Sequence, residues 1–164
     1  MKQQKSMKTI MLTLLICLIS ITASAGEPKP IQLALLNPIQ LVSEGEAVQG
    51  IRLNLFYGKN SSVKGLDIGL VNYTTSGLSK GYQVGLVGLN DADFLGFQNN
   101  FVNSVKGNCE GFQWGFVNHA QNMNGFQLGI VNYAGTMKGL QIGLVNVIKQ
   151  NGQFPIFPFI NWSF

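Results

Sequence analysis

The sequence predicts an all-β protein made of tandem repeats of 14–16 residues, most simply a small β-solenoid with capped ends. One phrase of eight residues recurs along the chain: glycine, apolar, Gln, apolar, glycine, apolar, Val, Asn. Self-similarity at a fixed period indicates a repeating architecture. Within each copy apolar residues alternate with other residues, which favours a strand, and a stretch rich in Gly, Asn, Ser and Thr follows as a turn.

We number the positions of the phrase as slots one to eight. Degenerate units flank the clear copies, at residues 31–37 and 158–161. A stacked array is expected to have such atypical terminal units, because its end faces must be closed. The glycines in slot one are Gly50, Gly65, Gly81, Gly96, Gly111, Gly125 and Gly139.

The two glycines and the Asn of each phrase are the predicted structural positions. Equivalent residues of a solenoid stack on one another, which explains why the same types return in every unit. Glycine permits corner conformations closed to other residues, and an inward Asn can bond to the Asn above and below it. In the clearest copies these positions are Gly65, Gly69, Asn72, Gly111, Gly115, Asn118, Gly125, Gly129, Asn132, Gly139, Gly143 and Asn146.

Alternation predicts which side chains point inward. In the unit that begins at Gly125, the side chains of Phe126, Leu128 and Ile130 fall on the same side as Asn132 and are expected in the core. The opposite side is expected to face solvent and forms a candidate binding row. Its members are Gln83, Gln98, Gln113, Gln127, Gln141, Tyr73, His119 and Tyr133.

Two further expectations follow from the same assignment. The aromatic residues of slot two should stack inside the coil. They are Tyr82, Phe97, Phe112 and Phe126. Asp67 occupies a Gln slot and should project outward beside Arg52, where an exposed ion pair would contribute about 0.2–1 kcal/mol.

An antiparallel β-meander or an outer-membrane β-barrel is the alternative fold. The ending FINWSF looks like the last strand of an outer-membrane protein. However, slots two to six cover only roughly 15 Å of strand, less than the ~25 Å apolar band of such barrels. Pro155 and Pro158 would also interrupt the ladder of a closing strand. In the solenoid, residues 154–164 instead form an aromatic cap over the last turn of the coil.

The chain begins like an exported protein. Lys2, Lys5 and Lys8 precede a short apolar stretch, and Ala23-Ser24-Ala25 is an A-x-A cleavage site, so residues 1–25 are predicted to be a signal peptide. Without these three lysines, eight basic and seven acidic residues remain, a net charge of about +1. No basic cluster survives to bind nucleic acid. We expect a location in the periplasm, the outer membrane or the cell surface.

The remaining chain is predicted to be one domain. It comprises a leader and degenerate first unit at 26–49, the tandem repeats at 50–153 and the cap at 154–164. Cys109, in an expected turn at 106–110, is its one cysteine and has no partner for an internal disulfide. The expected reading is a tolerated turn residue, with an intermolecular disulfide or a reactive thiol as the alternative.

The sequence contains no constellation typical of an enzyme. His119 is the one histidine and occupies a slot that holds Tyr in other units. Asp91-Ala92-Asp93 resembles half of a calcium loop but lacks the further acidic ligands. We therefore expect no catalytic residues, no metal and no cofactor.

The units GLDIGLVNYTTSG, GFQWGFVNHAQNMN and GLQIGLVNVI resemble those of bacterial surface-repeat proteins built on Gly-x-Gln-x-Gly-x-Val-Asn. The resemblance covers residues 31–164 and implies an exported protein of the envelope or surface. We expect a non-enzymatic structural or interaction scaffold with an unknown envelope or surface partner and a possible association with the outer membrane. The sequence does not indicate its oligomeric state. The alternatives are the small outer-membrane barrel and a secreted carbohydrate-binding module; an ice-binding role lacks the regular Thr-x-Thr ladder.

Overall fold

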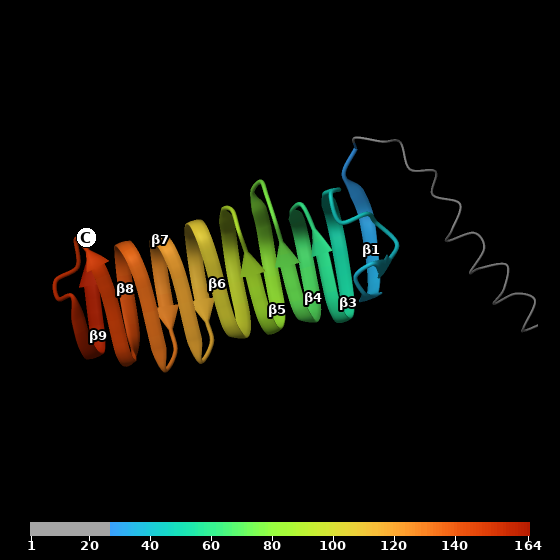
Figure 1. Cartoon of the computed structure of the whole chain (residues 1–164). Helices are drawn as coiled ribbons and strands as arrows, with labels where there is room; N and C mark the ends of the chain where they lie inside the picture. The colour runs from blue at the N-terminus through green and yellow to red at the C-terminus, as the bar shows by residue number, and fades with distance from the viewer. Residues whose placement is uncertain (1–26) are drawn as a thin grey trace, which may run out of the picture.

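The computed structural model describes residues 27–164, and this part of the chain is a rod-shaped β-solenoid without helices (Figure 1). A single nine-stranded sheet coils around the rod axis in about eight stacked turns of about 15 residues. The predicted signal peptide lies outside the described residues. The strands are β1 (Lys29–Leu36), β2 (Ile39–Gln40), β3 (Val48–Asn60), β4 (Val63–Thr74), β5 (Ser79–Asn90), β6 (Phe94–Trp114), β7 (Val117–Leu128), β8 (Val131–Gln150) and β9 (Ile156–Ser163).

Strand pairing confirms the solenoid. From β1 through β3 to β8, each strand pairs in parallel with the next, so equivalent slots of successive units lie side by side. Slot three of β7, Gln127, pairs with Gln141 of β8, and Asn118 pairs with Asn132. Parallel neighbours are incompatible with the antiparallel meander or barrel, in which consecutive strands run in opposite directions.

The two ends of the rod are closed by reversed strands. At the first end β2 pairs antiparallel with β1, and at the last end β9 pairs antiparallel with β8. The cap differs from the expectation of an aromatic cover. Phe159 and Phe164 are exposed, while Phe154 and Trp162 are half-buried and pack edge to face. The buried residue of β9 is Asn161, whose amide bonds to the backbone of Phe154.

The predicted orientation of the strands is wrong in one respect. Gln in slot three points inward, and the apolar residues of slots two and four point outward. The reason is a corner of the chain at slots five and six, as at Gly129 and Ile130. At this corner two consecutive residues, Ile130 and Val131, both face outward. This doubling shifts the alternation by one residue, so Gln127 before the corner and Asn132 after it are both buried.

The buried Gln residues form a column of hydrogen-bonded amides. The Nε2 of Gln141 donates to Gln127 Oε1 at 2.7 Å, and Gln127 donates in the same way to Gln113 at 2.7 Å. The column continues through Gln98 and Gln83, each donating toward the N-terminal end of the rod. Gln141 Oε1 begins the column and is one of three buried side-chain polar atoms without a partner among residues 27–164.

The Asn residues of slot eight form a second column that donates in the opposite direction. The Nδ2 of Asn118 donates to Asn132 Oδ1, and that of Asn132 to Asn146 Oδ1, both at 2.8 Å. Each amide also donates to a backbone carbonyl, as Asn132 does to Ile142 at 2.9 Å. The predicted inward Asn ladder is therefore confirmed, and its amide dipoles oppose those of the Gln column.

An apolar core fills the rest of the coil interior. It combines the residues two positions after the Asn of slot eight with the residues two positions before the first glycine. The cluster consists of Phe94, Val105, Cys109, Ala120, Met123, Ala134, Met137 and Ile148. The inside of the rod is thus part amide column and part ordinary hydrophobic core.

Gly139 illustrates why slot one requires glycine. Its φ is 140°, a conformation that other residues rarely adopt, and a Cβ there would collide with the carbonyl oxygen of Gly125 in the previous turn. The close stacking of backbone on backbone at this position therefore depends on the missing side chain. Slot one therefore requires glycine, but within a strand such as β8, whereas the bend of the chain lies at slots five and six.

Candidate interaction surface

The outward slots form columns along the rod that are apolar except at Asn99 in slot four. Slots two, four and six alternate with the buried slot three and with slot five, and parallel in-register pairing places each slot beside its equivalent in the next turn. We call these three columns the apolar face. Successive turns lie about 4.8 Å apart, so eight turns give a face roughly 34 Å long and about 13 Å wide.

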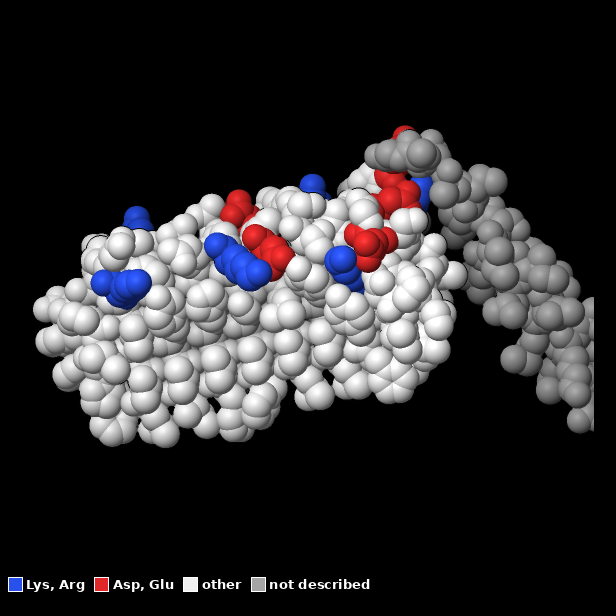
Figure 2. All heavy atoms as spheres, viewed as in Figure 1, with Lys and Arg blue, Asp and Glu red and all other residues white. Residues whose placement is uncertain are grey.

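The most exposed part of this face is slot six, at the corner of the coil, which we call the corner column. Its exposed side-chain fractions run from 41% to 60%. Figure 2 shows that Lys, Arg, Asp and Glu gather along one edge of the rod, while the lower part of the same view is free of them. The corner column is Leu70, Leu86, Phe101, Phe116, Ile130 and Leu144.

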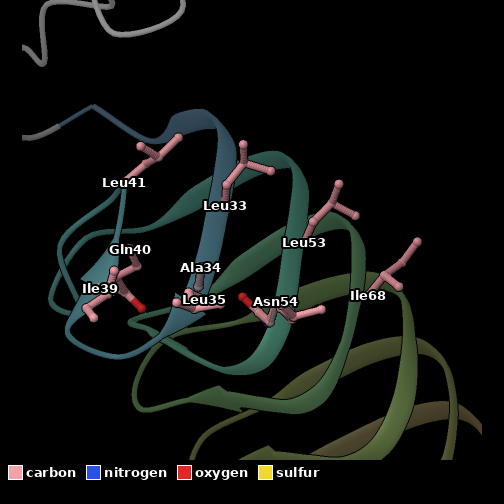
Figure 3. A pocket seen from close by; sticks show the side chains of 10 residues that line it. Leu33, Ala34, Leu35, Ile39, Gln40, Leu41, Leu53, Asn54 and Ile68 are labelled. Atoms are coloured by element: carbon pink, nitrogen blue, oxygen red, sulfur yellow. The ribbon is translucent and has the colours of Figure 1, made fainter. Parts of the chain in front are cut away.

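A groove runs between slots four and six, because slot five carries a small or inward side chain. Near the first end of the rod it has a volume of about 610 Å³. Figure 3 shows Leu33, Leu53 and Ile68 pointing outward in a row, with Ile39 and Leu41 beyond them at the end of the coil. The lining is aliphatic except for Gln40 and Asn54, so this part of the groove suits a mainly apolar occupant.

The groove reappears farther along the rod with aromatic walls. This second segment has a volume of about 410 Å³, and its walls include Trp114, Phe101 and Phe116. The rings of Phe101 and Phe116 stack at 4.2 Å between centroids. Gly115 and Gly129 form part of the floor. The slot-five glycines therefore serve the outside of the coil as well as the inside.

The aromatic column of slot two lies outside the coil, which corrects the expectation that it is buried. Phe126 is half exposed, and Tyr82, Phe97 and Phe112 are half-buried against one another. The rings of Phe97 and Phe112 stack at 5.1 Å between centroids, and those of Tyr82 and Phe97 lie 5.2 Å apart. Ring-on-ring contact thus replaces core packing for this column.

The predicted binding row is divided by the structure. Tyr73, His119 and Tyr133 directly follow the Asn of slot eight, a position that we call slot nine. They do face outward and are half-buried, and the rings of His119 and Tyr133 stack at 5.2 Å between centroids. The Gln members belong inside the coil, so this part of the prediction is wrong. These Gln members of the row, each at most 1% exposed, are Gln83, Gln98, Gln113, Gln127 and Gln141.

Tyr73 is held by a polar contact at the charged edge. Its hydroxyl donates to Asp91 Oδ2 at 2.5 Å, and this hydrogen bond raises the pKa of Tyr73 to about 12. Burial acts to raise the pKa of Asp91, but hydrogen bonds from Lys106 and Tyr73 outweigh it and keep that pKa below its ordinary value. Asp93 accepts from the backbone and side chain of Asn108. Both carboxylates of the half calcium loop thus have protein partners.

Other lysines near the apolar face carry unpaired charge. Lys64, Lys80 and Lys138 occupy the position just before the first glycine, are exposed, and take part in none of the ion pairs found within residues 27–164. Lys64 and Lys80 are neighbours in register. We call these three lysines the basic rim. Glu110 occupies the same position in another unit and is also exposed.

Cys109 lies in strand β6 within the apolar core, not in a turn as the sequence suggested. Burial raises the pKa of its thiol to about 12, so the reactive thiolate is scarce at neutral pH. Within residues 27–164 no group of three or more His, Cys, Asp or Glu side chains is placed to hold a metal ion.

No segment of residues 27–164 forms a helix with the length and hydropathy needed to cross a bilayer.

Sequence reasoning missed the apolar face because it assumed that apolar slots point inward. A usable signal was present in slot three, where Arg52 and Asp67 replace Gln in successive units. Opposite charges in stacked positions can pair inside a coil as well as outside it.

Comparison with protein-family models, with curated proteins and with solved structures gives no match for this chain.

Proposed function

We propose that this chain is an exported, non-enzymatic interaction scaffold of the bacterial envelope, and that the apolar face is its working surface. The observation that carries the proposal is the inverted distribution of side chains. Amides and a buried ion pair share the coil interior with an apolar cluster, while many Leu, Ile, Phe and Trp side chains line its outside. A protein built to remain alone in water gains nothing from this arrangement, because exposed apolar columns receive no hydrophobic stabilisation.

The extent of the face supports a docking role. Single exposed apolar residues are normal on protein surfaces, but contiguous patches beyond a few hundred Å² mark sites of interaction. A face of about 34 by 13 Å covers roughly 440 Å² before the residues beyond the corner are counted. Its regular columns also offer the same chemistry at every turn, which suits an extended or uniform partner.

The predicted leader and the resemblance to surface-repeat proteins support export to the envelope. Extracellular and periplasmic domains often depend on disulfides. Here the stacked amide columns and the coiled sheet supply the order that disulfides supply elsewhere. Cys109 is buried and unpaired, which is compatible with either redox environment.

The carbohydrate-binding alternative is weaker. It relied on an outward row of Gln amides and aromatic rings, because sugars need hydrogen-bonding groups beside a stacking platform. Gln113 and Gln127 donate to partners inside the coil, and the aromatic segment around Trp114 retains Asn99 as its one neighbouring outward amide. An apolar partner fits this surface better.

Cell fractionation after export tests the proposal. Leu86 and Leu144 are 53% and 60% exposed on the corner column, so the double change Leu86→Ser and Leu144→Ser should leave the fold intact and release the protein from the envelope into the soluble fraction. Leu78 is 42% exposed in the turn before β5, away from the face. Leu78→Ser is therefore the matched control and should remain with the envelope.

The same experiment can overturn the proposal. If the unaltered protein and both variants divide between the envelope and the soluble fraction in the same proportion, the apolar face does not hold the protein at the envelope. An uncleaved chain retained in the cytoplasm, detected by its intact mass, would refute export. Circular dichroism of each purified variant checks that the fold is retained.

A further inference from the structure

We propose that the partner of the apolar face is the surface of a lipid membrane that contains anionic headgroups. The corner column enters the apolar layer beneath the headgroups, and the basic rim meets their phosphates. This inference rests on the proposed function and adds the chemistry of the partner. Three features of the surface lead to it: its shape, its charge and its aromatic residues.

The shape favours a fluid partner. Slots two and four lie before the corner at Gly129 and Ile130, and the outward slots seven and nine lie after it. The corner column is the most exposed part of the surface because two faces meet there. A flat, rigid partner could cover one of these faces at a time. Lipid chains can pack on both sides of the corner and fill the groove beside it.

The charge favours an anionic partner. Lys64, Lys80 and Lys138 stand two residues before slot two, so they border the apolar face along one side. They have no ion-pair partner within residues 27–164, whereas Lys59 and Lys106 pair with Glu44 and Asp91. Free lysines beside an apolar surface are the arrangement that attracts a protein to anionic lipids.

The aromatic residues lie at the depth expected of a membrane interface. Trp114 is 51% exposed in slot four, between the basic rim and the corner column. Tyr82 lies in slot two, closer to the rim, and its hydroxyl accepts from Asn99. Trp and Tyr favour the boundary between headgroups and hydrocarbon because one end of each ring system is polar.

A second copy of the chain fits the surface less well. It would present an identical apolar face bordered by identical unpaired lysines. Glu110 is the one exposed carboxylate in the same position, so it could meet only part of that charge. Anionic headgroups can neutralise every lysine of the rim at once.

Tryptophan fluorescence can test membrane docking directly. The chain has two tryptophans, and Trp162→Phe leaves Trp114 as the single reporter while conserving the ring that packs on Phe154. The processed protein is mixed with vesicles of phosphatidylcholine alone or mixed with phosphatidylglycerol. We expect the Trp114 emission to shift to the blue with the anionic vesicles, more weakly with neutral ones, and less at high salt.

Two single substitutions to Gln, one of a lysine and one of a glutamate, test the role of charge in membrane binding. Lys80 and Glu110 are both exposed and occupy the same position in different units. Lys80→Gln should weaken binding to anionic vesicles about fivefold, and Glu110→Gln should strengthen it to a similar degree. A general structural effect of Gln at this position would change both affinities in the same direction.

The outcomes separate this inference from the proposed function. Equal binding to neutral and anionic vesicles, with no effect of either variant, would refute the role of the basic rim. No binding to any vesicle, while Leu86→Ser and Leu144→Ser still release the protein from the envelope, would refute the lipid partner and leave a protein partner. A dimer in sedimentation with Trp114 already shielded would identify a second copy as the occupant.

Discussion

Arg52 and Asp67 form a buried two-pronged ion pair at the end of a column that is otherwise made of Gln. The Nε of Arg52 lies 2.7 Å from Asp67 Oδ1, and its Nη2 lies 2.8 Å from Oδ2. Gln83 also donates to Oδ2 at 2.8 Å, so the amide column ends on the carboxylate. The sequence predicted this pair but placed it in solvent. Burial changes the consequence of removing either partner.

We expect Arg52→Gln or Asp67→Gln alone to lower the free energy of unfolding by about 3–5 kcal/mol, because each leaves an uncompensated buried charge. The double variant should recover most of that loss. It extends the Gln column by two members, and a Gln at position 67 can donate to the carbonyl of Tyr73 as Gln127 does to Tyr133. Urea unfolding of the four proteins gives the comparison.

A matched exposed pair is the control for this cycle. Lys106 and Asp91 lie 2.8 Å apart, with 65% of the Lys106 side chain exposed. Lys106→Gln should cost at most about 1 kcal/mol. The double variant with Gln at positions 52 and 67 should be more stable than either single variant. If it is no more stable than the less stable single variant, the amide column does not extend through these turns.

Gly88 and Asn100 exchange the roles of two slots. Gly88 stands where other units carry the Asn of slot eight, and Asn100 stands where the next unit should carry the glycine of slot five. Asn100 fills the space with its own amide and donates to Asn103 Oδ1 at 2.7 Å. A side chain at Gly88 would collide with Asn100 and with Gln83. The two irregular units are therefore one compensated change.

Gly88→Asn should destabilise the protein by about 1–3 kcal/mol through overpacking. Adding Asn100→Gly should restore stability, because the pair then matches the regular repeat. The double variant also removes Asn100 Oδ1, a buried oxygen that accepts no hydrogen bond among the described residues. Thermal unfolding of the single and double variants measures the coupling. Additive losses would mean that the two residues do not share one space.

Asn132 tests the second amide column. Its Nδ2 donates to Ile142 O and Asn146 Oδ1, and its Oδ1 accepts from Asn118. Asn132→Ala should lower stability by about 1–3 kcal/mol, because these buried groups lose their partners. Asn124 is exposed beside the first glycine of the same unit, and Asn124→Ala should change stability by less than about 0.5 kcal/mol. Equal urea midpoints for the two variants would contradict a stacked Asn ladder.

The sequence predicted the period, the parallel coil and the inward Asn, because each follows from the repetition of identical residues. It could not predict the orientation of slot three by alternation alone. Gln127 and Asn132 are five positions apart, so strict alternation puts one inside and the other outside. Both point inward only because Ile130 and Val131 both point outward at the corner.

The candidate surface was missed for a related reason. The general tendency of apolar residues to be buried was applied to slots two, four and six. In a stacked coil, however, identical amides satisfy one another along the axis, so a buried Gln column such as Gln113 on Gln98 is not left without hydrogen bonds. Apolar residues such as Phe116 are then free to face outward, and they form the candidate surface in place of the predicted Gln row.

His119 gives the protein a pH dependence that can be measured. Partial burial holds the pKa of His119 below its ordinary value. Its ring stacks on Tyr133, and its Nδ1 lies 3.2 Å from Ser104 Oγ. In the unfolded chain the imidazole takes up a proton near its ordinary pKa of about 6.5, while the folded protein still excludes it. The unfolded state therefore binds more protons in this range, and stability must fall as pH decreases.

We expect the urea midpoint to decrease between about pH 7 and pH 5, above the range in which most carboxylates titrate. His119→Tyr places in slot nine the residue that Tyr73 and Tyr133 supply in other units, so it should keep the stacking and remove this part of the pH dependence. His119→Gln removes the titration without the ring and separates the two effects. If the urea midpoint depends on pH in the same way in both variants as in the unaltered protein, His119 is equally free to accept a proton in the folded and unfolded states.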